Sequence, residues 1–395
     1  MSSTADALRA SLSAAQAAFK TPHPSPAPSK SLASALFAQD SPLFTTDSKP
    51  DVSADTSNTS PANPTLAPKS GSNPQVDQEL VKSFARSLEV PLGVKLEQVS
   101  LKWSGWEGAT SFGGSDAAPE GGYEALVGKV FAEAEKNGAE VSVSTSVKGI
   151  KESDGKVTVD SDKGTFEAST VICTIPLGVL KSLPDTFFTP ALPGQFQEAI
   201  EGTHVGVLEK LLLNYQTAWW PNHETVGSYT FLPTGPTPTE SSSLEEIFAG
   251  STLTAANFAC PSLPGPNPTL LTYLSETPAR LLLQHPTEKV AIAYHEYLVK
   301  RFGASDAPKP SNYNLTDWLT DPLSRGATTT PSIISENGER SPMDFKELSR
   351  PVWGGKLGFA GEHTEMEHRG SVAGAVVSGQ REAARVVRYF ESQSA

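Results

Sequence analysis

The sequence is poor in cysteine and in basic residues. Its 395 residues contain two cysteines, Cys173 and Cys260, so we expect no disulfide framework and a reducing, cytoplasmic compartment. Neither lies in a CxxC or Cys/His cluster, so no metal site is expected, and Cys173 is predicted to be a buried small residue. With 31 Lys and Arg against 44 Asp and Glu, the formal charge is −13, which argues against nucleic acid or an anionic membrane as a partner.

Long apolar runs are also absent. None reaches the length of a membrane span, and residues 1–19 are Ala-rich and amphipathic without a signal-peptide core. A chain of this length can nevertheless bury a sizeable core in two domains. The composition therefore predicts a large, soluble, intracellular protein.

The first 75 residues form a low-complexity segment. Residues 6–19 carry apolar side chains at helical spacing and predict one short amphipathic helix. Residues 21–75 are crowded with Pro, Ser, Thr and Ala and offer little to bury apart from an apolar patch at 32–44. We expect most of this segment to be mobile.

Regular patterning begins at residue 76. Helices are predicted over 76–88 and 124–137. Alternation at Val141, Val143, Thr145 and Val147 predicts a strand, and the Asp154-Gly155 turn leads to strands at 156–160 and 170–175. These three strands are predicted to form a meander. Residues 205–215 predict a further apolar strand that is interrupted by Lys210.

The most informative stretch is residues 353–379, WGGKLGFAGEHTEMEHRGSVAGAVVSG. It predicts a short strand at 356–360, a turn through Gly361 and Glu362, and a helix from Ser371 whose first turns are small residues. One side of that helix is apolar: Val372, Ala375, Val376, Gly379, Ala383, Val386, Val387 and Phe390. Ligands collect at such strand ends, and free N–H groups at a helix start suit an anion. An ordinary, tightly packed strand-helix crossover explains the spacing equally well.

Three separated motifs resemble the flavin-containing amine oxidases, the family of monoamine and polyamine oxidases and lysine-specific histone demethylases. They are residues 353–379, residues 170–182 (TVICTIPLGVLKS) and residues 314–326 (NLTDWLTDPLSRG). The resemblance implies an α/β fold, in which a Rossmann-like FAD/NAD(P)-binding domain is interleaved with an α+β substrate domain. It also implies FAD as the cofactor and oxidation of an amine C–N bond to an imine, with O2 reduced to H2O2.

The resemblance divides the chain into domains. The substrate domain would comprise a helical part at 76–120 and residues 201–325, and the FAD-binding domain residues 121–200 and 326–395. It also assigns residues to cofactor binding: Val147, Thr174, Pro176, Trp318, Gly361, Glu362, Ser371 and Val372. Lys210 would be the catalytic residue that holds a water beside flavin N5, whereas a lone lysine in a strand more often lies on a solvated face.

Two departures from the family pattern stand out. The family's GxGxxG phosphate-binding turn is absent, since no two glycines are separated by a single residue. We therefore expect an N-terminally incomplete dinucleotide-binding unit and weak FAD retention, and a partner could supply the missing unit. Thr328 and Ser371 stand where many members carry aromatic residues around the amine, which leaves the particular amine open.

Three functions stay open from the sequence. The first is a polyamine-type amine oxidase. The second is a non-catalytic or partner-completed remnant that cannot retain FAD alone. The third, with less support from the sequence, is a histone lysine demethylase, because neither a helical tower insertion nor a basic surface is evident.

Overall fold

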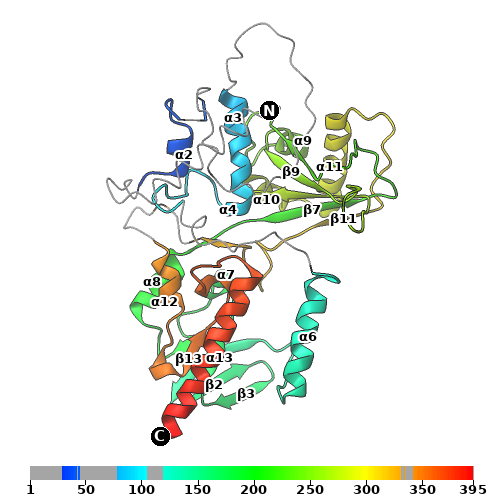
Figure 1. Ribbon diagram of the computed structural model, residues 1–395. Helices are drawn as coiled ribbons and strands as arrows, with labels where there is room; N and C mark the ends of the chain where they lie inside the picture. The colour runs from blue at the N-terminus through cyan, green and yellow to red at the C-terminus, as the bar shows by residue number, and fades with distance from the viewer. Residues whose placement is uncertain are drawn as a thin grey trace, which may run out of the picture. The chain divides into compact units, whose positions relative to one another are not determined.

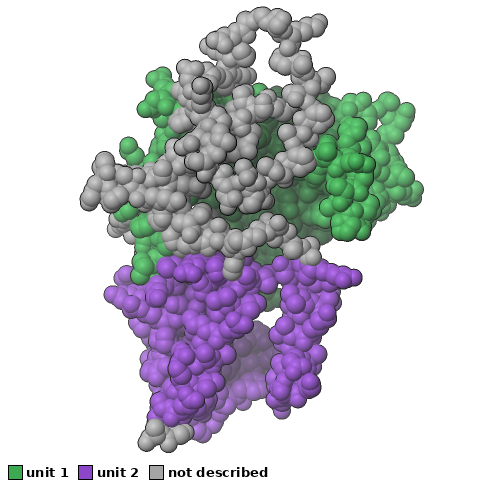
Figure 2. All heavy atoms as spheres, viewed as in Figure 1, with its two compact units in different colours: residues 1–108, 176–181, 201–344 green, residues 109–175, 182–200, 345–395 purple. Residues whose placement is uncertain are grey.

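The computed structural model describes residues 29–41, 43–44, 78–104, 119–330, 334 and 341–394. The chain divides into two compact units, each assembled from separate stretches (Figure 2). Unit 1 comprises residues 1–108, 176–181 and 201–344, and unit 2 comprises residues 109–175, 182–200 and 345–395. The helix predicted at 6–19 lies outside the described residues, as does most of the segment predicted to be mobile.

Unit 1 contains a five-stranded antiparallel sheet with the order β11-β7-β10-β9-β8 (Figure 1). Its strands are β7 (Glu209–Asn214), β8 (Ser228–Phe231), β9 (Leu253–Asn257), β10 (Thr269–Leu274) and β11 (Asn312–Leu315). Helices α9 (Leu244–Ala249), α10 (Glu276–Leu282) and α11 (Thr287–Phe302) pack with it. Alternate residues of β7 are buried, as expected where one face of a sheet meets a core. That core joins leucines of β7 and β10 to Tyr294 and Leu298 of α11.

The helix predicted at 76–88 is present as α3 (Gln78–Ala85) and a 3-10 turn η1 (Arg86–Leu88), followed by α4 (Glu89–Leu92). The apolar patch near residue 32 forms α2 (Leu32–Leu36), whose first turn is capped by the side chain of Ser31. Leu32 and Leu36 pack against Val94, Leu96 and Val99 in a small core of unit 1. This part of the low-complexity segment therefore has apolar surface to bury.

The strand predicted at 205–215 is divided in two. β6 (His204–Val205) pairs with β12 (Thr329–Thr330), and β7 begins at Glu209. This pairing places β12 in unit 1, although the resemblance assigned residues 326–395 to the FAD-binding domain. Helix α7 (Leu177–Leu180), whose N-cap is Pro176, also belongs to unit 1.

Unit 2 contains a four-stranded sheet with the order β3-β2-β1-β5. Its strands are β1 (Val147–Ser153), β2 (Lys156–Ser161), β3 (Gly164–Ala168) and β5 (Phe188–Thr189). Asp154 and Gly155 both have positive φ, at 52° and 84°, which is the two-residue turn that matches the twist of a hairpin. The turn prediction is therefore confirmed.

The predicted meander is wrong in two of its strands. Residues 139–146 form no strand, and the first strand begins only at Val147, because the alternating residues have no strand to pair with in the described chain. The strand expected third is β4 (Val171–Cys173), which leaves the meander and pairs in parallel with β13 (Leu357–Phe359). The third strand of the meander is β3, which the sequence reading missed.

Helices α6 (Gly122–Lys136) and α13 (Val372–Ser394) belong to unit 2. Helix α8 (Gly194–Gly202) begins in unit 2, and its last two residues belong to unit 1. Two short 3-10 turns, η2 (Trp353–Gly355) and η3 (Glu362–Thr364), flank β13, and α12 (Met343–Leu348) precedes them. Phe359 of β13 packs against Phe196 of α8, with ring centroids 4.5 Å apart. The strand at 356–360 and the helix from Ser371 are thus confirmed.

The apolar side of α13 is largely exposed. Val372, Val376, Val387 and Phe390 are each more than two-fifths exposed, whereas the buried positions are Gly374, Ser378 and Glu382. α13 therefore packs through a small and polar face. Helix α6 has no buried residue at all, although it carries an apolar stripe. Unit 2 leaves much apolar surface uncovered in the part of the chain that the structure describes.

Candidate functional site

The first group of predicted site residues lies at the carboxyl ends of the parallel strands of unit 2. β4 and β13 run in register, with Cys173 opposite Phe359, and the amide of Ala360 donates to the carbonyl of Cys173 over 3.0 Å. Thr174 follows one strand, and Gly361 and Glu362 follow the other. The motifs at residues 170–182 and 353–379 are therefore neighbours, at the edge where ligands bind in α/β sheets.

Gly361 makes the turn after β13 sterically feasible. Its φ is 142°, and a Cβ atom there would lie 2.6 Å from the ring of His363. The amide of Gly361 donates to the hydroxyl of Ser378 on α13 over 2.9 Å, and its carbonyl accepts from Thr364. Any other residue would be strained at this position, so the glycine fixes the exit path of the strand.

Glu362 and Ser371 hold the connection between the strand and α13. The Glu362 carboxylate accepts from the amide of Gly370 over 2.8 Å, which is the role of an ordinary turn carboxylate. The hydroxyl of Ser371 donates to the carbonyl of His368 over 2.6 Å and accepts from the amide of Gly374 over 3.0 Å. Ser371 is thus a helix N-cap. Both side chains place the start of α13 beside the turn.

The helix start offers an unused donor. Among the described residues, no acceptor is recorded for the amide of Val372, the first residue of a 23-residue helix. Its side chain is 42% exposed, so the amide is close to the surface of unit 2. An electron-rich carbonyl or an anion placed here would gain a hydrogen bond and a favourable helix dipole.

A buried ion cluster fastens α13 to β13, and the sequence reading missed it. Glu382 is almost fully buried and accepts from Arg381 at 3.1 Å and from Arg385 at 2.6 Å. Arg381 also donates to the carbonyls of Phe359 and Thr364, at 2.7 and 2.9 Å. The sequence signal for this cluster was Glu382, which follows Ser378 at the same helical interval as Ser378 follows Gly374, on the face opposite the apolar stripe.

Lys210 lies on β7 of unit 1 and is half-buried. Its backbone pairs with Tyr273 on β10, and its amide donates to the hydroxyl of Thr316 over 2.8 Å. Within the described chain, no acid or acceptor is recorded for its side-chain ammonium group. A half-buried lysine without a counter-ion is free to hold a water molecule or a ligand atom.

Glu209, the residue before Lys210, organises the neighbouring loop. It is fully buried, and its carboxylate accepts from the hydroxyl of Thr316 and from the amides of Trp318 at 3.2 Å and Leu319 at 2.8 Å. Glu209 therefore ties the Trp318 segment to the strand that carries Lys210. An acid in an otherwise apolar strand was the sequence signal for it, and that signal went unused.

Trp318 is 46% exposed, so it is not a core residue of the described structure. Its carbonyl accepts from the amide of Gly326 at 2.8 Å and from the hydroxyl of Ser324 at 2.7 Å, which closes the loop into a compact turn. The backbone is fixed on both sides while the indole stays accessible. This geometry suits a wall against a flat ligand.

Two motifs that are distant in sequence meet in unit 1. Gly178 of the Pro176-Leu-Gly-Val-Leu turn packs so closely on the Trp318 loop that a Cβ atom would lie 2.6 Å from the carbonyl oxygen of Ser324 and would collide with that of Arg325. Pro176 and the Trp318 loop are thereby fixed with respect to each other. The resemblance had named both segments without placing them together.

The other predicted residues occupy less constrained positions. Thr328 is half-buried, and its methyl group packs on Gly93. Val147 begins β1, where it pairs with Ser161, and is 38% exposed. Cys173 is buried as expected, and burial raises the pKa of its thiol to about 11, so it is not a reactive thiolate. No helix in the described part of the chain is long and apolar enough to cross a membrane.

Comparison with known proteins identifies the lineage. The chain matches the family described as flavin containing amine oxidoreductase over residues 62–387. It is 31% identical over 316 residues to lysine-specific histone demethylase 1 homolog 3 of Arabidopsis thaliana, covering 75% of this chain and 17% of that protein. It is 26% identical over 306 residues to polyamine oxidase 4 of Oryza sativa subsp. japonica, covering 77% of this chain and 55% of that protein.

A third relative is the probable polyamine oxidase 4 of Arabidopsis thaliana, which is 27% identical over 326 residues, or 80% of this chain and 58% of that protein. The chain thus spans between 17% and 58% of the length of these three relatives. The family match covers most of the chain and includes all three motifs. The protein therefore belongs to the flavin containing amine oxidoreductase family.

Proposed function

We propose that the protein oxidises the C–N bond of an amine to an imine, with FAD as cofactor and O2 reduced to H2O2. The observation that carries the proposal is the half-buried Lys210, for which no counter-ion is recorded among the described residues, next to Glu209, which holds the Trp318 loop. The similarity to proteins named polyamine oxidase supports a linear polyamine as the substrate class. The acidic surface, with a formal charge of −13, favours the approach of a cationic amine.

The residues of unit 2 fit the flavin end of FAD by the chemistry of their donors and acceptors. At the strand ends, Glu362 offers a carboxylate to a ribityl hydroxyl, and Val372 offers an unused amide to the flavin carbonyl region. For the phosphates, the sequence offers no Gly-x-Gly turn. When bound, FAD supplies the two-electron acceptor for the hydride that leaves the amine carbon.

Each residue then has a defined task. Glu362 would orient the cofactor by accepting from a ribityl hydroxyl, and the Val372 amide at the helix start would stabilise negative charge on the flavin. Trp318 forms a wall for a flat ring, and Lys210 holds a water molecule in place. Thr328 and Ser371 replace the aromatic residues that would grip the amine, so recognition of the substrate charge depends on other groups.

The test is Lys210→Met in a fusion that places a strand-helix-strand unit with a Gly-x-Gly-x-x-Gly turn ahead of Met1. Losing the water-positioning group should slow flavin reduction or reoxidation by about 100-fold or more, measured by stopped-flow absorbance. The matched control is Lys300→Met, an exposed lysine of unit 1 that pairs with Glu245. Unchanged rates in both half-reactions of Lys210→Met would remove Lys210 from the mechanism.

The amine class is settled in the same assay. Spermine and spermidine are compared with a histone peptide that carries dimethyl-lysine, because several relatives are named lysine-specific histone demethylase. Peroxide release with the polyamines and not with the peptide is the expected result. Turnover of the peptide alone would assign the demethylase function instead.

A second candidate function rests on a different observation. Helix α6 has no buried residue, β4 has one edge without a described partner strand, and residues 139–146 alternate without forming a strand. Parallel sheets in folded proteins are covered on both faces, so this surface suits a further strand-helix-strand unit. On this proposal the chain holds FAD only when a partner supplies that unit.

A further inference from the structure

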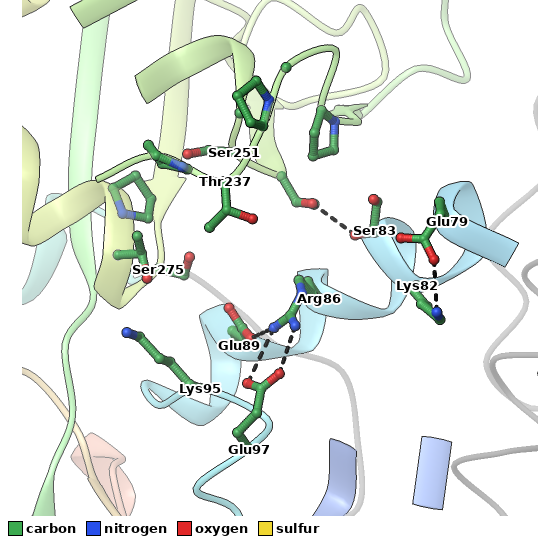
Figure 3. Close-up of a pocket in the computed structure, with 18 of the residues that line it drawn as sticks. Glu79, Lys82, Ser83, Arg86, Glu89, Lys95, Glu97, Thr237, Ser251 and Ser275 are labelled. Atoms are coloured by element: carbon green, nitrogen blue, oxygen red, sulfur yellow. Dashed lines mark hydrogen bonds and ion pairs between the residues drawn. The ribbon is translucent and has the colours of Figure 1, made fainter. Parts of the chain in front are cut away.

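Unit 1 contains a cavity that includes none of the predicted site residues (Figure 3). Its volume is about 810 Å³, which is within the range of small-molecule sites. One wall is formed by α3, η1, α4 and the following Lys95 to Glu97 segment, and the others by residues 233–238, residues 250–252 and the start of α10. All of these segments belong to unit 1.

The cavity walls are fixed before any ligand arrives. The hydroxyl of Thr252 donates to the carbonyl of Ser83 over 2.8 Å, which ties the α3 wall to the start of β9 (Figure 3). On the opposite rim, Gly250 lies against Pro236 so closely that a Cβ atom would collide with the proline carbonyl oxygen. The amides of Thr234 and Gly235 both donate to the carbonyl of Ala249. Such preorganisation reduces the entropy cost of binding.

The α4 wall carries one carboxylate more than its cation can satisfy. Arg86 donates to Glu89 at 2.7 Å and to both oxygens of Glu97 at 3.3 and 2.6 Å (Figure 3). One positive charge is thus shared by two negative charges. Glu89 is only 7% exposed, and its two recorded hydrogen bonds, from Arg86 and from the Leu96 amide, both use Oε1. In the described chain, Oε2 of this buried carboxylate has no recorded donor.

A group of opposite charge, the ammonium group of Lys95, lies in the same cavity. Lys95 lines it, and no ion pair or hydrogen bond of its ammonium group is recorded among the described residues. Lys82, by contrast, pairs with Glu79 at 2.8 Å. Ser275 also lines the cavity; it is 7% exposed, and no hydrogen bond of its hydroxyl is recorded in the described structure. Lys95 is close enough to Glu97 to act on its charge, but Glu97 is already bound by Arg86. A buried hydroxyl and an ammonium group with no recorded hydrogen bond among the described residues suit a carboxylate.

We propose that this cavity binds a small zwitterion of the amino acid class, with its ammonium group on Glu89 and its carboxylate on Lys95 and Ser275. Each end of such a ligand meets a group of opposite charge: Oε2 of Glu89, which has no recorded donor in the described chain, and the Lys95 ammonium group. A dication would meet Lys95 and a simple carboxylate would meet Glu89, so both are disfavoured by like charge. The site is independent of the flavin chemistry proposed above.

Three probes of nearly equal length separate the charge requirements: 4-aminobutyrate, butyrate and 1,4-diaminobutane. Binding to the full chain is measured by isothermal titration calorimetry, with ligand-observed NMR for weak affinities. We expect 4-aminobutyrate to bind at least about tenfold more tightly than either of the others, because it alone gains both charged hydrogen bonds. Equal affinities, or no binding of 4-aminobutyrate, would overturn the proposal.

Single substitutions then test which residue binds each end of the ligand. Lys95→Met should weaken 4-aminobutyrate by about tenfold or more and should not weaken 1,4-diaminobutane. Its matched control, Lys82→Met, removes a paired lysine from the same cavity and should leave both affinities unchanged. Equal effects of the two lysine variants would overturn the site.

Glu89→Gln should weaken both ligands that carry an ammonium group, with Glu79→Gln as the control. If Glu89→Gln does not fold, as judged by circular dichroism, Lys95→Met decides, because Lys95 is only half-buried and has no recorded side-chain partner in the described chain. Loss of FAD or of amine oxidation in any variant is scored separately. The zwitterion site and the flavin function can therefore fail independently.

Discussion

Glu209 shows how a single buried acid can stabilise a loop that is distant in the sequence. Its carboxylate accepts from one hydroxyl and two amides of residues 316–319, so hydrogen bonds compensate its charge, and no cation partner is recorded for it in the part of the chain that the structure describes. Carboxylates that accept several hydrogen bonds are stabilised even when buried. The position of Trp318 therefore depends on a residue more than a hundred positions earlier in the chain.

Glu209→Ala should destabilise unit 1 by about 2 to 4 kcal/mol, because three part-buried donors lose their acceptor. Urea unfolding measures the loss, and the fluorescence of Trp318 should change because its backbone is released. Glu209→Gln should cost less, since its carbonyl still accepts one amide. If the alanine variant matches the wild type in both measurements, the carboxylate does not hold the loop.

Protonation of His363, in the turn after β13, makes the stability of the folded protein depend on pH. Burial, and then the charge of Arg381, lower its pKa from 6.5 to about 4. The unfolded chain therefore binds this proton more readily than the folded chain between these two pH values. The contribution of His363 to the free energy of unfolding is therefore fully present above about pH 6.5. It decreases by about 3 kcal/mol as the pH falls toward 4.

Replacing the ring tests this pH dependence. His363→Gln should be less stable than the wild type at pH 7 and should lose less stability between pH 6.5 and 4, as measured by urea unfolding at a series of pH values. The control is His223→Gln, since His223 is exposed. Parallel pH profiles for His363→Gln and the wild type would show that the buried ring does not titrate in this range.

Elements with strong local signals were predicted from the sequence, and elements that depend on a partner were not. α13, β13 and the Asp154-Gly155 hairpin form because periodicity, small residues and turn chemistry act locally. Residues 139–146 show equally regular alternation, yet they stay irregular because a strand needs another strand beside it. Their Val143 is 73% exposed. Alternation alone therefore specifies a face and not a pairing.

The helix start and the turn before it can be tested separately in the FAD-binding fusion. Glu362→Ala should weaken FAD by about 1 to 3 kcal/mol, the range for a lost charged hydrogen bond. Val372→Ala should leave affinity nearly intact, whereas Val372→Pro removes the amide donor and should cost much more. Fluorescence titration of FAD gives the three affinities.

The control for the turn itself is Glu362→Gln, which keeps an acceptor for the Gly370 amide. If Glu362→Gln binds FAD as weakly as Glu362→Ala, the negative charge and not the turn bond carries the effect. Equal affinities for the alanine and proline variants at Val372, together with no loss at Glu362, would make this stretch a packing element only.

At the scale of the whole molecule, the sequence predicted candidate site residues but not the residues that support them. Lys210, Trp318 and Thr328 belong to unit 1, and Gly361, Glu362 and Val372 to unit 2. The resemblance identified these positions by motif. Glu209, Arg381 and Glu382 escaped because their role depends on partners that are adjacent only after folding. Burial of an acid cannot be read from composition when its donors lie in a distant loop.

The exposed apolar side chains of unit 2 lead to a prediction about how firmly the chain retains FAD. The chain as it stands should lose FAD on dialysis, and the fusion described above should retain it. Val130→Glu and Phe131→Lys on α6 should change the stability of the chain alone by less than about 0.5 kcal/mol, because both side chains are already exposed. The same changes should abolish FAD retention by the fusion, measured by flavin absorbance after gel filtration.

Retention of stoichiometric FAD by the chain alone would contradict the need for a further unit. Retention by the fusion despite both α6 changes would show that α6 is not the contact surface. Glu135→Lys serves as the control, since Glu135 belongs to the same helix and does not line the hollow that Leu126 and Val130 share.

The contact between β13 and α13 also constrains how this sequence can vary. A Cβ atom at Gly358 would collide with the Glu382 carboxylate and with the guanidinium of Arg385. The two positions should therefore show epistasis: Gly358→Ala should be harmful beside Glu382 and better tolerated once Glu382 is shortened to Ser. A pairwise mutational library should recover these changes together more often than their separate frequencies allow. We therefore expect residues 358 and 382 to vary together, although 24 positions separate them in the sequence.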